Sequence, residues 1–300
     1  MARILLTGAS GQVGGELLAT LAPLGEIVAP TRSEMDLADA EAVRRTIREV
    51  APRWIVNPGA YTAVDKAESE PELAHAINEH AVRAMGEEAK KLGAGVIHFS
   101  TDYVFDGTGT TPYKEDDLTG PVSVYGASKL AGEKALAATG AAHMIFRTSW
   151  VYGATGKNFV RTILKLAREK ERLTIVADQN GAPTWSRDLA RMTQRVIDWT
   201  EASARGRNLD EALASYSGVY HAPGAGETTW YGFATEAVRL AKQREPEVKF
   251  AVLEPIPTTQ FPTPAKRPAN SRMNAAKLAG KFDWRMMDWK DSLAEVIKAI

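Results

Sequence analysis

The sequence predicts an α/β protein built on a doubly wound parallel sheet, with a smaller lobe toward the C-terminus. Short, continuously apolar runs alternate with helical patterns through the first half of the chain. Continuous apolar runs are typical of strands in a sheet that helices cover on both faces, and a β-α-β-α series builds a parallel sheet. The length of 300 residues suits one large α/β unit or a core with a second lobe.

The individual elements follow from these patterns in chain order. Apolar runs predict strands at 3–7, 26–30, 53–57, 95–100 and 143–149. Helical patterns between them predict helices at 12–22, 39–50, 72–92, 125–139 and 157–170. Later elements are less regular and comprise a helix near 186–200, a strand at 218–222, and helices near 228–243 and 290–299. Prolines cluster in 254–271, which predicts either an ordered loop of the smaller lobe or a mobile lid.

Composition and charge exclude several classes of protein. Lys plus Arg and Asp plus Glu number 37 each, and the resulting net charge of zero argues against nucleic acid as a partner. No apolar run approaches the ~18 residues of a membrane span, and "MARILLTGAS" has no signal-type apolar region, so we expect a cytoplasmic protein without a membrane partner. The chain has no cysteine and five histidines, which excludes thiolate catalysis and supplies a metal centre poorly.

A glycine-rich turn follows the first predicted strand. The segment "LLTGASGQVG" places Gly8, Gly11 and Gly14 between that strand and the head of the next helix. Glycines let the backbone approach a pyrophosphate, and the amides of a helix N-terminus meet its negative charge. A tight structural turn would use the same residues, but the position at the start of a βαβ series favours a dinucleotide site. The predicted domains are a dinucleotide-binding Rossmann core over 1–150, with returning elements near 186–222, and a substrate-binding lobe from 151–185 and 223–300.

The end of the second predicted strand bears on which dinucleotide binds. An acidic residue at this corner would bind the ribose hydroxyls of NAD, whereas "APTRSEMDL" has Thr31 and Arg32 there. A guanidinium suits a ribose phosphate, so the sequence favours NADPH, with NADH possible; a solvated loop cation is the alternative for Arg32. Asp36 and Leu37 are better placed for the edge and pocket of the adenine.

A phenol and an ammonium lie one helical turn apart in "VYGASKLAGEK". Tyr125 and Lys129 share one helix face at this spacing, and a nearby cation lowers the pKa of a phenol from its usual value near ~10. This would make Tyr125 a usable acid, although the same spacing also occurs as a half-buried aromatic beside a solvated cation. Thr101 ends the fourth predicted strand, where its hydroxyl would hold a substrate carbonyl oxygen or serve a structural purpose.

The chain resembles the dTDP-4-dehydrorhamnose reductase family of the extended short-chain dehydrogenase/reductase superfamily, over nearly its whole length. The segments that carry the resemblance are "TGASGQVG", "NPGAYTAVDKAE", "HFSTDYVFDG", "VYGASKLAGE", "FRTSWVYG", "DQNGAPTW", "TTWYGFA" and "PTPAKRPANSRMN". The resemblance implies NAD(P)H-dependent reduction of the 4-keto group of dTDP-4-dehydro-L-rhamnose, giving dTDP-L-rhamnose for cell-surface polysaccharide. It also implies a homodimer.

The resemblance assigns roles to particular residues. It makes Tyr125 the acid that protonates the new alkoxide, Lys129 the residue that lowers the tyrosine pKa and holds the nicotinamide ribose, and Thr101 the residue that orients the carbonyl. The further cofactor contacts that it implies are Gly11, Gln12 and Val13 at the pyrophosphate, Ala60, Tyr61 and Thr62 in the loop after the third strand, and Phe99 near the cofactor. The implied substrate contacts are Thr101, Asp102 and Trp150. For Trp150, packing in the core is the alternative.

Two other functions are compatible with this fold. Dehydratases of the superfamily use a Thr-Asp-Glu series, and Tyr103 stands here in the place of the glutamate, so simple reduction is favoured over dehydration and, less firmly, over epimerisation. A non-catalytic, nucleotide-binding regulatory subunit would not need the acid.

Some family members bind magnesium between subunits through glutamates. Glu16 fits one such place, but Arg187 stands where a second acid is expected, so we predict no metal site.

The smaller lobe gives weaker signals. Lys266, Arg267 and Arg272 would face a diphosphate or lie on the surface as solvated cations. The aromatic residues of "ETTWYGFATEAV" are predicted to pack in the core of that lobe.

Overall fold

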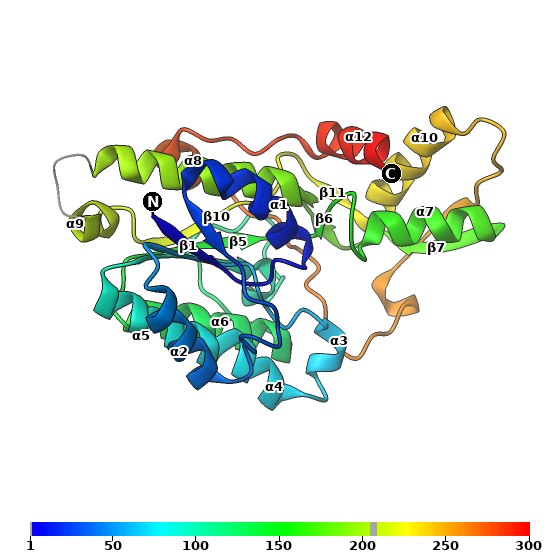
Figure 1. The fold of residues 1–300 in the computed structure, drawn as a ribbon. Coiled ribbons are helices and arrows are strands. Elements are labelled where there is room, and N and C mark those ends of the chain that lie inside the picture. Colours follow the sequence, from blue (N-terminus) through cyan, green and yellow to red (C-terminus); the bar gives the residue numbers. More distant parts are fainter. Residues whose placement is uncertain (1, 205–208) are drawn as a thin grey trace.

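A six-stranded parallel sheet forms the centre of the molecule (Figure 1). A computed structural model describes residues 2–204 and 209–300, and within these ranges the sheet has the order β2-β1-β3-β4-β5-β10. Its strands are β1 (Arg3–Leu6), β2 (Glu26–Val28), β3 (Trp54–Asn57), β4 (Gly95–Thr101), β5 (His143–Thr148) and β10 (Gly218–His221). Every neighbouring pair is parallel, so the predicted α/β class and the parallel sheet are confirmed.

The strand order fixes where a ligand fits. The chain passes from β1 to β2 at one edge and then places β3 on the other side of β1. The loops after β1 and β3 therefore leave the sheet in opposite directions, and a crevice opens between them at the carboxyl ends of the strands. The predicted glycine turn lies directly after β1, at this crevice.

Helices cover both faces of the sheet (Figure 1). One face carries α1 (Gln12–Leu21) and α8 (Ser186–Ser203), and the other carries α2 (Ala40–Val50), α5 (Ala81–Leu92) and α6 (Val124–Ala138). Val43 and Ile47 of α2 are four positions apart, lie on one helix face and are fully buried. Asp39 begins this helix because its carboxylate accepts hydrogen bonds from the amides of Glu41 and Ala42.

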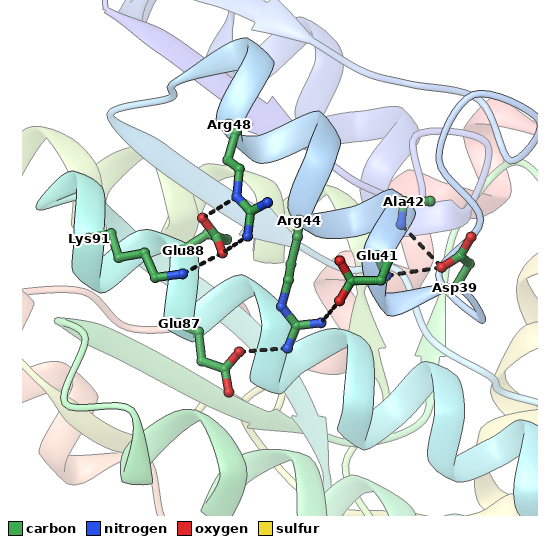
Figure 2. Close-up of polar contacts among 8 residues, drawn as sticks. All are labelled: Asp39, Glu41, Ala42, Arg44, Arg48, Glu87, Glu88 and Lys91. Atoms are coloured by element: carbon green, nitrogen blue, oxygen red, sulfur yellow. Dashed lines mark hydrogen bonds and ion pairs between the residues drawn. The ribbon is translucent and has the colours of Figure 1, made fainter.

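Ion pairs join the outer surfaces of α2 and α5 (Figure 2). Arg44 binds Glu87 with a donor-to-acceptor distance of 2.6 Å. Arg48 donates hydrogen bonds to both carboxylate oxygens of Glu88 at 2.9 and 2.7 Å, and Lys91 donates to the same carboxylate at 2.8 Å. The Glu88 side chain is only 2% exposed, so this carboxylate depends on its two cationic partners.

A second hydrophobic cluster holds the smaller lobe together. It is built around the helices α7 (Phe159–Glu169), α10 (Trp230–Arg244) and α12 (Trp289–Ala299) and the parallel strand pair β7 (Arg172–Val176) and β12 (Val252–Ile256). Two short pairs complete it, β6 (Val151–Tyr152) with β9 (Thr184–Trp185) and β8 (Asn180–Gly181) with β11 (Thr228–Thr229). The sequence patterns did not predict β7 or β12.

The helix predicted at 72–92 contains one irregular turn. It is α4 (Pro71–His75), a π-helical turn (Ala76–His80) and α5 in direct succession. Asn78 is buried in this turn, and its side chain binds the amide and the carbonyl of Tyr61 at 2.9 and 3.1 Å and the hydroxyl of Ser128 at 3.0 Å. The irregular turn thus anchors the loop after β3 to α6.

The remaining helices are short. They are α3 (Val64–Ala67), α9 (Leu209–Ala214) and α11 (Ala276–Phe282), with 3₁₀ turns at Ala22–Leu24, Asp102–Val104 and Thr258–Gln260. The proline-rich segment 254–271 begins at the end of β12 and then crosses to β8, where Asn180 donates to the Ala269 carbonyl at 2.8 Å and Ser271 donates to the Asn180 carbonyl at 2.7 Å. Its last part is therefore an ordered loop. Throughout the described part of the chain, helices that are both long and apolar enough for a membrane span are absent.

Candidate active site

A cleft of about 670 Å³ opens at the carboxyl ends of β1, β3, β4 and β5. The N-terminal turns of α1 and α6 and residues of the smaller lobe, among them Trp230 and Arg267, complete its walls. The residues predicted from the sequence that line this cleft are Gly8, Gly11, Gln12, Val13, Gly14, Ala60, Thr62, Phe99, Thr101, Asp102, Tyr125, Lys129 and Trp150. Residues from five separate segments of the sequence are thus brought to one place.

A second cavity of about 310 Å³ lies beside the cleft, at the end of β2. Arg32, Asp36 and Leu37 line it, and Gly8 and Ala60 line both cavities. The Arg32 side chain is 75% exposed and lies 3.5 Å from the Asp36 carboxylate, so its guanidinium is free to turn toward a ligand.

The Tyr61 side chain lines neither cavity. Its hydroxyl donates to Glu70 at 2.7 Å, and its backbone is held by Asn78.

The glycine turn is tightly packed and leaves no room for a side chain at two of its positions. Gly8 has φ +56°, and a Cβ there would lie 2.7 Å from the Cα of Gly59; a Cβ on Gly14 would overlap the Gly8 carbonyl. Gly11 precedes α1 and offers no side-chain cap, so the first amides of this helix are free to bind an anion. These features fit the pyrophosphate of a dinucleotide.

The three predicted catalytic side chains meet in the cleft. Thr101 ends β4, Tyr125 lies in the first turn of α6, and Lys129 lies one turn later. Ser123 caps α6 by accepting a hydrogen bond from the Gly126 amide at 3.2 Å. A Cβ at Gly126 would overlap the Tyr103 carbonyl, so glycine lets α6 approach the end of β4 closely.

The predicted effect of Lys129 on Tyr125 is wrong for the free protein. The Lys129 ammonium donates to the Phe99 carbonyl at 2.6 Å and lies 3.3 Å from Nε2 of His98, because the buried side chain turns toward β4. Burial raises the pKa of Tyr125, and a hydrogen bond with Thr101 opposes this only in part. Burial also lowers the pKa of Lys129 to about 8. Tyr125 therefore keeps its proton at neutral pH.

One carboxylate faces the cleft. Among the described residues that line it, Asp102 is the only acidic one. Burial raises the pKa of Asp102 to about 6, against hydrogen bonds from Ser271 and Thr101 that lower it. Thr101 donates to this carboxylate at 3.0 Å and accepts the Tyr103 amide at 3.2 Å. Burial raises the pKa of Tyr103 to about 12, so this phenol also keeps its proton at neutral pH.

Two tryptophans form a stacked pair at the side of the smaller lobe. Trp150 has φ +49°, and its ring stacks on Trp230 with centroids 3.7 Å apart and planes at 15°. Gln179 accepts a hydrogen bond from the Trp230 indole at 3.1 Å. Gly181 leaves room for the stack, because a Cβ there would lie 2.6 Å from the Trp150 ring.

The core prediction for "ETTWYGFATEAV" is correct for Phe233, which is fully buried, whereas Trp230 is half-buried, packs against the same cluster and also lines the cleft. Trp230 is the first residue of α10, and helix periodicity does not determine which way a terminal side chain points.

Of the three predicted cations, only Arg267 reaches the cleft. Its guanidinium pairs with Asp65 at 2.8 Å and donates to the Tyr103 hydroxyl at 3.3 Å. Arg272 instead binds the Thr110 carbonyl at 2.7 Å and Glu227 at 3.2 Å, and Lys266 is exposed outside the cleft.

Sequence reasoning missed Gly156 and Lys157, which line the cleft from the loop before α7. Asn158 in the same loop donates to the Gln12 side chain at 3.0 Å, so this loop is tied to the head of α1. A lysine in an irregular loop has no periodic signal that could have identified it.

The two residues considered for a metal form an ion pair. Arg187 donates to the Glu16 carboxylate at 2.9 Å. Over residues 2–204 and 209–300, no cluster of three or more histidine, aspartate or glutamate side chains could hold a metal ion.

Known proteins of one family are similar to this chain over nearly its whole length. The family model described as "RmlD substrate binding domain" matches residues 2–300. The chain is 46% identical to the dTDP-4-dehydrorhamnose reductase of Burkholderia thailandensis, over 96% of this chain and 95% of that protein.

Solved structures agree. The crystal structure of a dTDP-4-dehydrorhamnose reductase from Clostridium acetobutylicum has a TM-score of 0.87 at 35% identity, covering 99% of this chain and 98% of that one. The dTDP-4-dehydrorhamnose reductase of Bacillus anthracis in complex with NADP has a TM-score of 0.87 at 32% identity, covering 100% and 99%.

Proposed function

The chain belongs to the dTDP-4-dehydrorhamnose reductase family, and we propose that its cleft reduces the 4-keto group of dTDP-4-dehydro-L-rhamnose to give dTDP-L-rhamnose, with NADPH as the hydride donor. The observation that carries this proposal is that Thr101, Tyr125 and Lys129 line the same cleft as the glycine turn after β1. A proton donor and a dinucleotide cradle in one cavity suit the addition of a hydride and a proton across a carbonyl. The product is a precursor of cell-surface polysaccharide.

The cofactor residues divide between the two cavities. In this proposal, the amides of Gly11, Gln12 and Val13 bind the pyrophosphate at the head of α1. Asp36 and Leu37 lie against the adenine, and Arg32 binds the ribose phosphate that distinguishes NADPH from NADH. When bound, the dihydronicotinamide supplies the hydride. Phe99, Ala60 and Thr62 form the nearby wall of the cleft, and the backbone of Tyr61 contributes through the loop that Asn78 holds.

Tyr125 supplies the proton. As the carbonyl carbon gains the hydride, its oxygen gains negative charge and takes the phenolic proton of Tyr125, so the ketone becomes a secondary alcohol. Thr101 donates a hydrogen bond to the same oxygen, which requires its hydroxyl to turn away from Asp102. Lys129 keeps one N–H toward the cleft for the nicotinamide ribose. General acid catalysis of this kind contributes ~10²–10⁴-fold, and positioning supplies much of the remainder.

The substrate sugar lies between the two lobes in this proposal. Asp102 and Trp150 contact it, and the strained Trp150 backbone and the Trp230 stack hold the indole ring at the cleft wall. Arg267 faces the diphosphate from the smaller lobe. We accordingly divide the chain into a dinucleotide core over 1–150, with returning elements near 186–222, and a substrate lobe from 151–185 and 223–300. The separate hydrophobic cluster around α7, α10 and α12 supports this division.

The alternatives are less well supported. Dehydration needs a second carboxylate, and the lining residues that the structure describes offer Asp102 alone. A regulatory subunit would have no use for a half-buried phenol beside Thr101. Family membership also supports a homodimeric, cytoplasmic enzyme as part of the proposal, and analytical ultracentrifugation tests the dimer.

One assay tests the reaction. Purified protein is mixed with NADPH and dTDP-4-dehydro-L-rhamnose, and nicotinamide absorbance is followed while the sugar nucleotide is identified by mass spectrometry. We expect stoichiometric oxidation of NADPH and a product two hydrogens heavier than the substrate. Tight NADPH binding with unchanged absorbance would refute the reductase and favour a sensing role.

A further inference from the structure

A histidine that the proposed chemistry does not use lies directly behind the cleft. His98 is in the middle of β4 and is 0% exposed. Its Nδ1 lies 3.0 Å from the side-chain nitrogen of Asn57, and its Nε2 lies 3.3 Å from Nζ of Lys129. Both ring nitrogens therefore have polar partners, as expected for a buried imidazole, which would otherwise destabilise the fold.

The contacts continue beyond His98 to the glycine turn. The Thr7 hydroxyl donates to the Asn57 side-chain oxygen, and the Gly59 amide donates to the Thr7 hydroxyl at 3.1 Å. Thr7 directly follows β1, Asn57 ends β3, and both side chains are 1% exposed. A closed polar relay, Thr7–Asn57–His98, thus connects the ends of β1 and β3 with Lys129 of α6.

This relay restricts where the Lys129 ammonium can point. An ammonium has three N–H donors. The Phe99 carbonyl accepts one at 2.6 Å, and Nε2 of His98 lies within reach of a second. The third N–H is left for the cleft, which Lys129 lines. An apolar side chain in place of His98 would leave the buried ammonium with one fixed partner.

We propose that His98 is a positioning residue for Lys129, and that the Thr7–Asn57–His98 relay holds the lysine ammonium in the orientation that the reaction requires. This proposal rests on the proposed reductase function. His98 touches neither cofactor nor substrate in it and acts only through Lys129.

The protonation of the pair follows from its surroundings. The titratable groups around it are Lys129 itself, His143 on the neighbouring strand β5, and Glu133 one turn further along α6, which is paired with Arg147 at 2.7 Å. Burial, followed by the charge of Lys129, holds the pKa of His98 well below its usual value. The imidazole is therefore neutral, and its unprotonated nitrogen can accept a hydrogen bond.

A neutral imidazole that accepts the ammonium at Nε2 carries its own proton on Nδ1. Asn57 satisfies that tautomer with its amide turned, so that its oxygen faces His98 and its nitrogen faces Thr7, and the Thr7 hydroxyl then accepts from Asn57 in place of the donation described above. The charge of Lys129 therefore selects the tautomer of His98.

Two substitutions separate the two sides of the imidazole. His98→Gln places an amide oxygen where Nε2 stood and still accepts from Lys129, whereas His98→Asn reaches only the Asn57 side. Loss of the acceptor disfavours the charged lysine, so its pKa falls below about 8. For His98→Asn we expect kcat/KM to fall about tenfold, the equivalent of one hydrogen bond to a charged group, and the alkaline limb of its pH profile to move to lower pH.

His98→Gln is the matched control. We expect it to stay within about threefold of the unaltered protein and to keep its pH profile, since one acceptor replaces another. Equal losses in the two variants, or an unchanged pH profile in His98→Asn, would overturn the proposal. Thermal unfolding is recorded for both variants. A loss of kcat/KM that accompanies a lowered Tm, with no shift of the pH profile, also counts against the proposal.

A spectroscopic measurement keeps the test independent of turnover. Protein labelled with ¹⁵N-histidine reports the tautomer of each of the five histidines, and His98→Gln identifies the signal of His98. We expect a neutral, Nδ1-protonated ring at neutral pH that changes in Lys129→Met. An Nε2-protonated ring that is indifferent to Lys129→Met would refute the relay. If the unaltered protein does not oxidise NADPH with the sugar nucleotide, the reductase proposal fails, while this spectrum still decides the contact.

Discussion

The ring of Tyr103 meets the ring of Tyr125 edge to face, with centroids 5.5 Å apart and planes at 78°. Tyr103 thus packs beside the proposed acid at the position where dehydratases of the superfamily carry a glutamate. An edge-to-face pair stabilises by ~0.5–1.5 kcal/mol and fixes the orientation of both rings. We propose that tyrosine at this position favours reduction, because its ring packs on Tyr125 and it brings no second carboxylate.

Changing Tyr103 tests this relationship. Tyr103→Phe keeps the ring and should retain most activity, because it loses only the long hydrogen bond from Arg267. Tyr103→Glu places a carboxylate beside Asp102 and removes the ring contact, so we expect kcat/KM for reduction to fall at least about tenfold. Steady-state assays of both variants check this. Full activity in Tyr103→Glu would show that the ring contact is irrelevant.

Arg32 should determine the preference between cofactors. Arg32→Ala should weaken NADPH about tenfold and leave NADH nearly unchanged, because only NADPH carries the ribose phosphate. Cofactor titrations followed by fluorescence measure both affinities. Arg45→Ala removes the same charge from an exposed position on α2 outside both cavities and should change neither. Equal weakening of NADH and NADPH binding by Arg32→Ala would show that Arg32 does not contact the ribose phosphate.

Gly181 should be needed for substrate binding rather than for cofactor binding. In Gly181→Ala the new methyl would lie 2.6 Å from the Trp150 ring and displace the tryptophan stack. We expect KM for the sugar nucleotide to rise about tenfold with NADPH affinity unchanged. Gly280→Ala is the control, because nothing lies within 4 Å of its added methyl. A Gly181→Ala enzyme with an ordinary KM would place the sugar away from Trp150.

Glu88 should make stability depend on acid pH. Its hydrogen bonds with Arg48, and then those with Lys91, lower the pKa of Glu88 to about 2 in the folded chain, from 4.5. A lowered folded pKa contributes stability above pH 4.5, and this contribution is lost as pH falls toward about 2. We expect Glu88→Gln to lower the free energy of unfolding by about 2 kcal/mol at neutral pH and by much less at a pH near about 2.

Urea unfolding at neutral and acid pH measures this difference. Glu41→Gln is the control, since the Glu41 side chain is 74% exposed and should cost less than about 0.5 kcal/mol. If Glu88→Gln lost the same stability at every pH, the ion pairs in Figure 2 would not be responsible.

The sheet and the cofactor turn could be predicted because their signals are local. β3 and β4 are buried at every residue and β1 and β5 at every residue after the first, and glycine at 8 and 14 is required by close backbone approaches. β7 and β12 escaped prediction because they form a separate two-stranded pair, and β12 carries no fully buried residue that would mark it as a strand. Long-range pairing, rather than local pattern, makes them strands.

The candidate site likewise contains features that the sequence could predict and features that it could not. Spacing placed Tyr125 and Lys129 on one helix face, and both line the cleft. Spacing could not show that the Lys129 ammonium binds the Phe99 carbonyl and lies beside His98, since those partners come from β4. The direction of the Tyr125 pKa shift is set mainly by burial, which spacing does not show either. Trp230 and Lys157 likewise reach the cleft only through the packing of the smaller lobe.

The most direct test of the account is a single-turnover measurement with Tyr125→Phe. Enzyme preloaded with NADPH is mixed rapidly with dTDP-4-dehydro-L-rhamnose, and the oxidation of the nicotinamide is followed. Because Tyr125 holds its proton at neutral pH and is the proposed donor, we expect the rate to fall ~10²–10⁴-fold while NADPH affinity stays unchanged. Oxidation of NADPH by Tyr125→Phe at the rate of the unaltered protein would contradict the assignment of this phenol as the proton donor.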